Sequence, residues 1–271
     1  MWQSIEEALV RAASLLKGFG YTDKNLSADS VLLPIALYLH QRGVTDAYLT
    51  SSKDAEDRHE IQQWVAKSLI KRGIWGSGLD TLLGRIRDAL KDSAAGGFPV
   101  AAVEKEMASV GKGLAFDEAE VEDLLMLEYG APRTFTVLSI LYPGLDLSNE
   151  FHEDHIFPKS RFTKSKLAQA GIPAEKLGDY IGSFNHLANL QLLAGVPNNE
   201  KRAAVPADWV ASDTVFPTAE KRATYVDAND LNDVPLTMDK FLEFYVARRE
   251  RVRQRLVKAL GASPVPPSAE A

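Results

Sequence analysis

The stretch FHEDHIFP at residues 151–158 carries more chemical information than any other part of this chain. It places His152, Glu153, Asp154 and His155 side by side and ends in an apolar pair and a proline. Alternating polar and apolar residues over 150–156 predict a short strand that leads into a tight loop. Neighbouring side chains of a strand point to opposite faces, whereas in a loop they can diverge around one phosphate group.

A second informative segment follows a predicted helical insert over about 163–181. The residues NLQLL at 189–193 predict another short strand. Pro197 is favoured in the first turn of a helix, so it predicts that a helix carries Asn198 and Lys201. Lys201 lies about one turn beyond Asn198, and both side chains can therefore approach the same ligand. The predicted order is strand, loop, strand and helix.

These residue types suit the hydrolysis of a phosphodiester bond. A neutral imidazole is an effective general base near pH 7, and His155 can take that role. A hard divalent cation neutralises phosphate oxygens and stabilises the leaving group, and it prefers oxygen ligands. Asp154 and Asn198 supply such oxygens. Asn189 offers both a donor and an acceptor to the backbone of the loop that bears His155, and Lys201 can meet phosphate.

The pattern resembles the HNH nuclease family, which has a ββα-metal fold. The matched residues are DHIFP at 154–158, then Asn189-Leu190, then Asn198 with Lys201 three residues on. The two asparagines are nine residues apart (198 − 189), as in the HNH domain of RNA-guided CRISPR nucleases. The resemblance implies that His155 is the general base and that Asp154 and Asn198 bind the metal. It also implies that Asn189 braces the loop.

The chain departs from the family pattern in two ways. The last metal-binding position is Asn198 and not a histidine, which favours Mg²⁺ or Mn²⁺ over zinc. The interval between His155 and Asn189 is long, so the helical insert must bulge away from the site.

Longer segments resemble the nuclease half of GmrSD-type, modification-dependent restriction enzymes and related phage-defence proteins. These segments are DHIFPKSRF, NHLANLQLL, NNEKRAAVPADWV and, more loosely, the stretch from Trp64 to Leu90. In that family an NTPase and sensor domain precedes the nuclease region. The sequence contains no P-loop and no Asp-Gly-x-Gln-Arg motif, so we expect that function in a further domain or in a separate sensor subunit.

Several neighbouring residues have alternative roles. His152 is a third metal ligand, a phosphate donor or a residue of a strand face, and Asn199 replaces Asn198 as the ligand if the helix starts one residue later. Lys159, Arg161 and Arg202 flank the site and are expected to contact DNA phosphates. The basic run from Arg248 to Lys258 is more often a solvated helix face than a phosphate-binding track.

The rest of the chain predicts a mainly α fold. Helical periodicity over 1–145 indicates a helical domain for linking or docking. Residues 146–262 are expected to form the ββα-metal HNH core with its helical insert and a long C-terminal helix over 238–260. Residues 263–271 are rich in proline, serine and alanine and predict a disordered tail.

Composition sets broad limits on the class of protein. The chain has no cysteine, which excludes disulfides, thiolate zinc sites and cysteine nucleophiles. The net charge of −6 is unlike that of a dedicated DNA-binding module, although basic residues gather near the His cluster. No apolar run is long enough to span a membrane, and the N-terminus lacks a basic start, so we expect a cytoplasmic protein.

Two functions compete on this pattern. The first is a metal-dependent DNA endonuclease that nicks or cuts duplex DNA. The second is a non-cleaving HNH-fold module that binds DNA or regulates a larger defence complex. The first requires the oxygens of Asp154 and Asn198 on one side of the molecule and a His155 ring that is not sealed in the interior.

Overall fold

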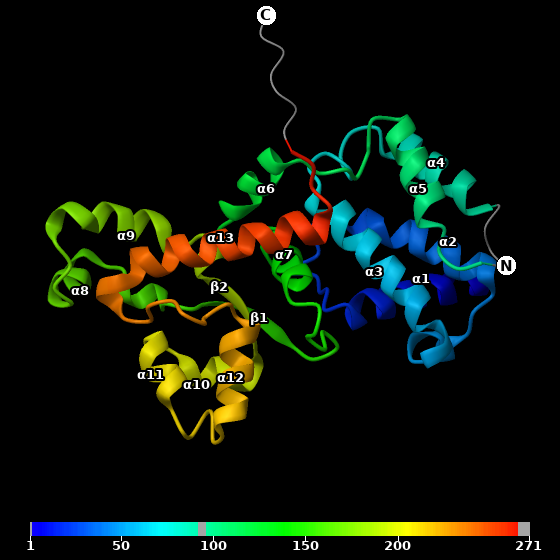
Figure 1. Cartoon of the computed structure of the whole chain (residues 1–271). Coiled ribbons are helices and arrows are strands. Elements are labelled where there is room, and N and C mark those ends of the chain that lie inside the picture. Colours follow the sequence, from blue (N-terminus) through cyan, green and yellow to red (C-terminus); the bar gives the residue numbers. More distant parts are fainter. Residues whose placement is uncertain (1, 92–95, 265–271) are drawn as a thin grey trace, which may run out of the picture. The chain divides into compact units, whose positions relative to one another are not determined.

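The computed structural model describes residues 2–91 and 96–264, apart from the side chains of residues 196, 198 and 199. The described chain is mainly helical and has a two-stranded sheet (Figure 1). The chain divides into two compact units. The first comprises the chain up to Ala115 together with Asp146–Asn149, and the second comprises Phe116–Leu145 and the chain from Glu150 onward.

The first unit is built from helices alone. Its α-helices are α1 (Trp2–Gly18), α2 (Leu32–Arg42), α3 (Ala55–Ile70), α4 (Leu79–Lys91) and α5 (Val100–Ser109), with short 3₁₀ turns η1 (Asp29–Val31), η2 (Asp46–Leu49) and η3 (Ser52–Asp54). Helix α1 buries Ala8, Ala12, Leu15 and Leu16, which recur at helical spacing on one face. Pro34 lies in the first turn of α2, where a proline removes no helical hydrogen bond.

A buried carboxylate organises the interior of this unit. Asp57 of α3 accepts hydrogen bonds from the hydroxyls of Tyr38 at 2.8 Å and Tyr48 at 2.6 Å, and from the backbone N–H of Phe98 at 2.6 Å. Arg42 forms an ion pair with the same carboxylate. One charged group therefore joins α2, α3, η2 and the segment that enters α5, and its negative charge is compensated by these four donors.

The second unit contains both strands and the remaining helices. Its α-helices are α6 (Glu118–Leu125), α7 (Thr134–Leu141), α8 (Lys164–Gln169), α9 (Leu177–Ser183), α10 (Gly195–Lys201), α11 (Pro206–Ala211), α12 (Ala219–Ala228) and α13 (Phe241–Leu260). The 3₁₀ turns are η4 (Lys159–Arg161), η5 (Ala174–Lys176), η6 (Leu187–Asn189) and η7 (Met238–Lys240). The strands are β1 (Phe151–His155) and β2 (Leu190–Ala194).

The two strands pair antiparallel although 34 residues separate them (190 − 155 − 1). Asp154 lies opposite Gln191, and His155 lies opposite Leu190. Because the side-chain period of a strand is two, Asp154 and His152 share one face of the sheet and His155 belongs to the other. Helix α10 follows β2 directly and packs against both strands. This order matches the predicted sequence of strand, loop, strand and helix.

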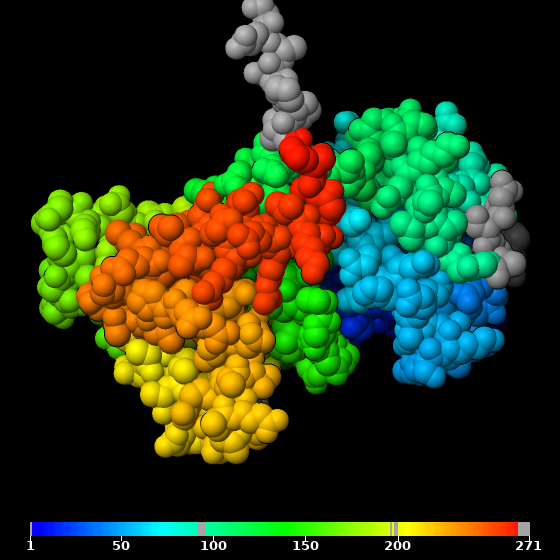
Figure 2. Space-filling model, viewed as in Figure 1, coloured from blue at the N-terminus to red at the C-terminus, as the bar shows by residue number. Residues whose placement is uncertain are grey.

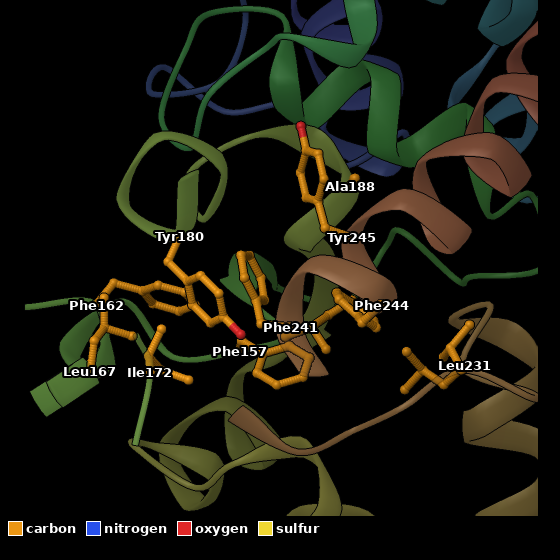
Figure 3. Packing of buried hydrophobic residues seen from close by; sticks show 12 residues of the cluster. Phe157, Phe162, Leu167, Ile172, Tyr180, Ala188, Leu231, Phe241, Phe244 and Tyr245 are labelled. Atoms are coloured by element: carbon orange, nitrogen blue, oxygen red, sulfur yellow. The ribbon is translucent and has the colours of Figure 1, made fainter. Parts of the chain in front are cut away.

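An aromatic cluster fills the interior of the second unit, as Figure 3 shows. Phe157 from the loop after β1 lies 4.7 Å from Phe244 and 5.3 Å from Phe241 of α13, measured between ring centroids. Phe162 and Tyr180 of the insert pack on Phe241 as well. The insert thus contributes to the same core as the strand exit. The apolar pair Ile156-Phe157, which directly follows β1, packs into this core.

Helix α13 is held by a buried guanidinium. Arg248 is fully buried and donates to the carbonyls of Ala188 at 2.7 Å and Asn229 at 3.0 Å and to the hydroxyl of Tyr142 at 2.7 Å. Burial of such a group is stable only with its donors satisfied, and the planar fork of arginine meets several acceptors at once. Arg248 therefore fixes α13 to η6, immediately before β2.

The interpretation of the basic run in α13 as a solvated face is wrong for part of it. Arg248 is buried, Arg249 pairs with Glu122 at 2.6 Å, and Arg255 pairs with Asp230 at 2.9 Å. Figure 2 shows α13 running along one face of this unit. A periodic run of arginines cannot reveal which members point inward, because the partners lie on helices distant in sequence.

The division into units differs from the predicted boundary at residue 145. Residues 116–145 belong to the second unit, because α6 and α7 pack on α13 and α7 also packs on β2. Ser263 was predicted to belong to the disordered tail, but its backbone has defined partners. Ser263 pairs with the start of α6, where its N–H donates to Phe116 O at 3.1 Å and its carbonyl accepts from Glu118 N at 3.0 Å. Residues 265–271 of that tail lie outside the described residues.

Within the described part of the chain, every helix is too short or too polar to cross a lipid bilayer.

Replacing Asp57 by alanine tests the first unit. We expect Asp57→Ala to lower the free energy of unfolding by about 3–5 kcal/mol. It leaves the buried hydroxyls of Tyr38 and Tyr48 and the N–H of Phe98 without their acceptor, and it removes one of the two carboxylates that pair with Arg42. Urea unfolding followed by the fluorescence of buried Trp64 measures the change. Asp46→Ala removes a carboxylate that is 87% exposed and pairs only with Arg11, so it is the matched control and should change stability little. Equal effects of the two variants would contradict this role of Asp57.

Candidate functional site

Asn189 joins the exit of β1 to the entry of β2. Its side chain is fully buried, accepts from the N–H of Phe157 at 2.9 Å and donates to the carbonyls of Phe157 at 3.0 Å and Phe184 at 2.8 Å. Its own carbonyl accepts from Ile156 N at 2.8 Å. These contacts are the backbone bridge expected from the sequence. They fix the direction in which the chain leaves Asp154 and His155.

Asp154 lies on the α10 face of the sheet and is held by two donors on one oxygen. Its Oδ2 accepts from Lys201 Nζ at 2.8 Å and from Gln191 Nε2 at 2.8 Å. Gln191 is fully buried and is held in turn by the hydroxyl of Tyr225, which donates to its Oε1 at 3.0 Å. Among the residues that the structure describes, no hydrogen bond reaches Oδ1 of Asp154, whose side chain is 14% exposed.

Lys201, which the sequence predicted to contact phosphate, is turned into the interior of the second unit. Its side chain is only 1% exposed, and besides pairing with Asp154 it donates to the backbone carbonyl of His155. Burial lowers the pKa of the ammonium group, and the carboxylate of Asp154 opposes that shift. The amphipathic stem of a lysine at the end of a short helix can turn inward as easily as outward, and here a nearby carboxylate attracts it inward. The residue links α10 to the end of β1.

His155 lies on the opposite face and is enclosed by two loops. Its ring stacks on Tyr129 with centroids 4.8 Å apart and lies 5.9 Å from Phe184. Its Nε2 is 3.0 Å from Oδ1 of Asn185, whose Nδ2 donates to Glu128 at 3.0 Å. Residues 128 and 129 belong to the α6–α7 connection, which therefore forms part of the candidate site.

The accessibility of His155 falls short of what the endonuclease hypothesis requires. The residue is 7% exposed, and its cover includes Tyr129, whose own exposed fraction is 45%. Burial lowers the pKa of the imidazole, while Asn185 and Asp154 act in the opposite direction. The lowered pKa favours the neutral ring, which is the form that accepts a proton.

The remaining predicted residues have simpler surroundings. His152 is partly exposed, lies on the same strand face as Asp154 and has Glu150 Oε1 3.5 Å from its Nε2. Lys159 is exposed in η4. Arg161 donates to the carbonyl of Ala203 at 3.2 Å, which ties η4 to the segment after α10.

Three further predicted residues lie in α10 or directly after it, namely Asn198, Asn199 and Arg202. Arg202 is exposed and has a positive φ of 43° immediately after the helix. The backbones of Asn198 and Asn199 belong to α10, but their side chains lie outside the described residues. The predicted metal contact of Asn198 and the alternative contact of Asn199 therefore stay predictions.

Sequence reasoning missed six residues that contact Asp154 and His155 directly or through one neighbour. They are Gln191, Tyr225, Glu128, Tyr129, Phe184 and Asn185. Gln191 carried a signal, since it is the polar residue inside the apolar strand NLQLL. Nothing local to Glu128 or Tyr129 indicates that tertiary packing brings them to the surroundings of His155.

The described residues contain no group of three or more His, Cys, Asp or Glu side chains placed to hold a metal ion. A site made of one carboxylate, one amide and water would not form such a group, and Mg²⁺ often binds with few protein ligands. Oδ1 of Asp154 fits that need. The buried ammonium of Lys201 beside Oδ2 lowers the negative charge at the same carboxylate.

No family model matches this chain, and no curated protein is similar to it in sequence.

A double-mutant cycle measures the ion pair between Asp154 and Lys201. We expect Lys201→Met to lower the free energy of unfolding by about 1–3 kcal/mol, because two acceptors lose their buried donor. The loss should be smaller in an Asp154→Asn background, with a coupling energy of about 0.5–3 kcal/mol. Lys159→Met, which removes an exposed lysine of the same unit, is the control. Additive effects in chemical denaturation would show that the pair contributes no stability.

Proposed function

We propose that this protein is a metal-dependent endonuclease of the HNH type that hydrolyses phosphodiester bonds of DNA. The observation that carries the proposal is the end of β1, where Asp154 and His155 are consecutive, Asn189 ties the strand exit to β2, and α10 follows β2 directly. The resemblance of DHIFP and the two spaced asparagines to HNH nucleases supports the same conclusion.

In this proposal the two faces of the sheet end divide the chemistry. His155 is the general base that takes a proton from the attacking water, and its lowered pKa keeps it neutral for that task. Asp154 would offer Oδ1 to Mg²⁺ or Mn²⁺, while Lys201 and Gln191 hold Oδ2 and fix the carboxylate plane. When bound, the cation neutralises phosphate oxygens and stabilises the leaving group. Asn198 is the second proposed ligand.

For this reaction, water must reach the ring of His155. Tyr129 covers part of the ring from an exposed position beside Gly130, where the backbone has a positive φ of 76°. We propose that DNA binding displaces this tyrosine. Lys159, Arg161 and Arg202 are the proposed phosphate contacts. Of these, Arg161 already donates to Ala203 O and would have to exchange that partner or share it.

A second function is favoured by a specific observation. His155 is largely buried and Lys201 occupies one oxygen of Asp154, which is the arrangement expected of an HNH-type fold that no longer cuts. Such a chain would bind DNA or regulate a larger defence complex. Under either function we propose a sensor domain or sensor subunit with NTPase activity as the partner, as the GmrSD-type resemblance implies.

A plasmid-nicking assay separates the two functions. With Mg²⁺ or Mn²⁺ the wild-type protein should convert supercoiled plasmid to the nicked or linear form, and excess EDTA should abolish the conversion. We expect His155→Ala to reduce the rate at least 100-fold, because general-base catalysis typically contributes about 10²–10⁴-fold. His59→Ala is the matched control, since it removes a histidine of the first unit, and should cleave at the wild-type rate.

Cleavage by His155→Ala at the wild-type rate would sink the endonuclease proposal. If neither the wild type nor any variant cleaves DNA, and if Asp154→Ala still binds DNA, the non-cleaving module is favoured.

A further inference from the structure

The His155 ring is surrounded by two adjacent pairs of residues from distant parts of the chain. One pair is Glu128-Tyr129 and the other is Phe184-Asn185. In each pair the aromatic residue lies against the imidazole, at 4.8 Å for Tyr129 and 5.9 Å for Phe184. The polar residue of each pair belongs to one chain of hydrogen bonds that ends on the ring.

This hydrogen-bond chain has a single consistent direction. The carboxylate of Glu128 can only accept, so the amide nitrogen of Asn185 must face it, as observed at 3.0 Å. Oδ1 of Asn185 then faces Nε2 of His155, also at 3.0 Å. Since this oxygen can only accept, Nε2 must carry the proton of the neutral ring. The free lone pair of the imidazole is therefore on Nδ1.

The backbone holds the two pairs in place independently of these side chains. Tyr129 N donates to Asn185 O at 3.0 Å, and Glu128 forms an isolated antiparallel bridge with His186. The hydroxyl of buried Thr134 donates to the carbonyl of Glu128 at 2.6 Å. A side chain at position 128 is therefore directed at Asn185 by fixed backbone, although Glu128 itself is exposed.

We propose that Asn185 and Glu128 are positioning residues for His155, which hold its ring in one orientation with the proton on Nε2. In the proposed nuclease reaction, the α6–α7 connection would thereby determine which ring nitrogen meets the water. This consequence rests on the proposed function. The orientation and protonation of the ring do not depend on the proposed function, because they can be measured without cleavage.

The test uses the direction of the hydrogen bonds from Glu128 through Asn185 to His155. Asn185→Asp places two carboxylates side by side and removes the donor to Glu128, so this series of hydrogen bonds should be broken. Adding Glu128→Gln to that variant supplies an amide that donates to the new carboxylate at position 185, which still accepts from His155. Asn185→Ala removes the link altogether. Glu122→Gln, which neutralises a partly exposed acid that pairs with Arg249, is the matched control.

The primary measurement is the Nε2–H resonance of His155 in ¹⁵N-histidine-labelled full-length protein, assigned by its loss in His155→Ala. We expect a proton protected from water exchange in the wild type, in Glu122→Gln and in the double variant. In Asn185→Ala the resonance should broaden beyond detection. In Asn185→Asp, where Glu128 repels the new carboxylate, the proton should exchange faster with water than in the wild type. Circular dichroism and thermal unfolding identify any variant that fails to fold. The positioning role of Asn185 and Glu128 is then judged from the variants that fold.

Nicking rates supply the second readout. We expect Asn185→Asp to lower the single-turnover rate roughly 10–100-fold, the range typical of residues that orient a catalytic group, and the double variant to regain most of it. A resonance that persists in Asn185→Ala, or a double variant no better protected than Asn185→Asp, would overturn the proposal. If the wild type does not nick DNA while the resonances behave as expected, the nuclease function fails and the positioning role stands.

Discussion

The structure of the candidate site depends on the side chain of Asn189. Two side-chain hydrogen bonds with Phe157 and one that its backbone carbonyl accepts from Ile156 join the loop after β1 to the segment before β2, and a third side-chain bond reaches Phe184. The side chain is fully buried. An amide is suited to this task because it donates and accepts without a charge that would need compensation. The aromatic cluster of Phe157 packs beneath this bridge, and Arg248 holds the carbonyl of Ala188 beside it. Strand exit, second strand and terminal helix are thus fixed together.

The two main side chains of the proposed site, Asp154 and His155, lie on opposite faces of the sheet. Asp154 faces α10, where a buried lysine and a buried glutamine occupy one of its oxygens, and His155 faces the α6–α7 connection. Each is oriented through a neutral amide, Gln191 on one face and Asn185 on the other. The amide fixes the geometry of His155 without a charge on the ring, whereas Asp154 is also paired with the ammonium group of Lys201.

Local patterns in the sequence predicted much of this arrangement. The alternation over 150–156, the apolar run NLQLL and Pro197 predicted two strands and a helix, and the donor and acceptor of Asn189 predicted its backbone bridge. What failed depended on contacts between distant segments. The inward turn of Lys201 and the burial of Arg248 require partners that only the fold supplies. The pairing of Glu128 with Asn185 spans 57 residues and has no local signature.

We propose that the end of β1 binds a divalent cation through Oδ1 of Asp154. Anomalous diffraction from crystals of the protein soaked in Mn²⁺ tests this directly. We expect an anomalous peak about 2.0–2.3 Å from Oδ1, with Lys201 and Gln191 still bonded to Oδ2 and with water completing the coordination. Peaks confined to other parts of the molecule, with Asp154 contacted only by Lys201 and Gln191, would contradict it.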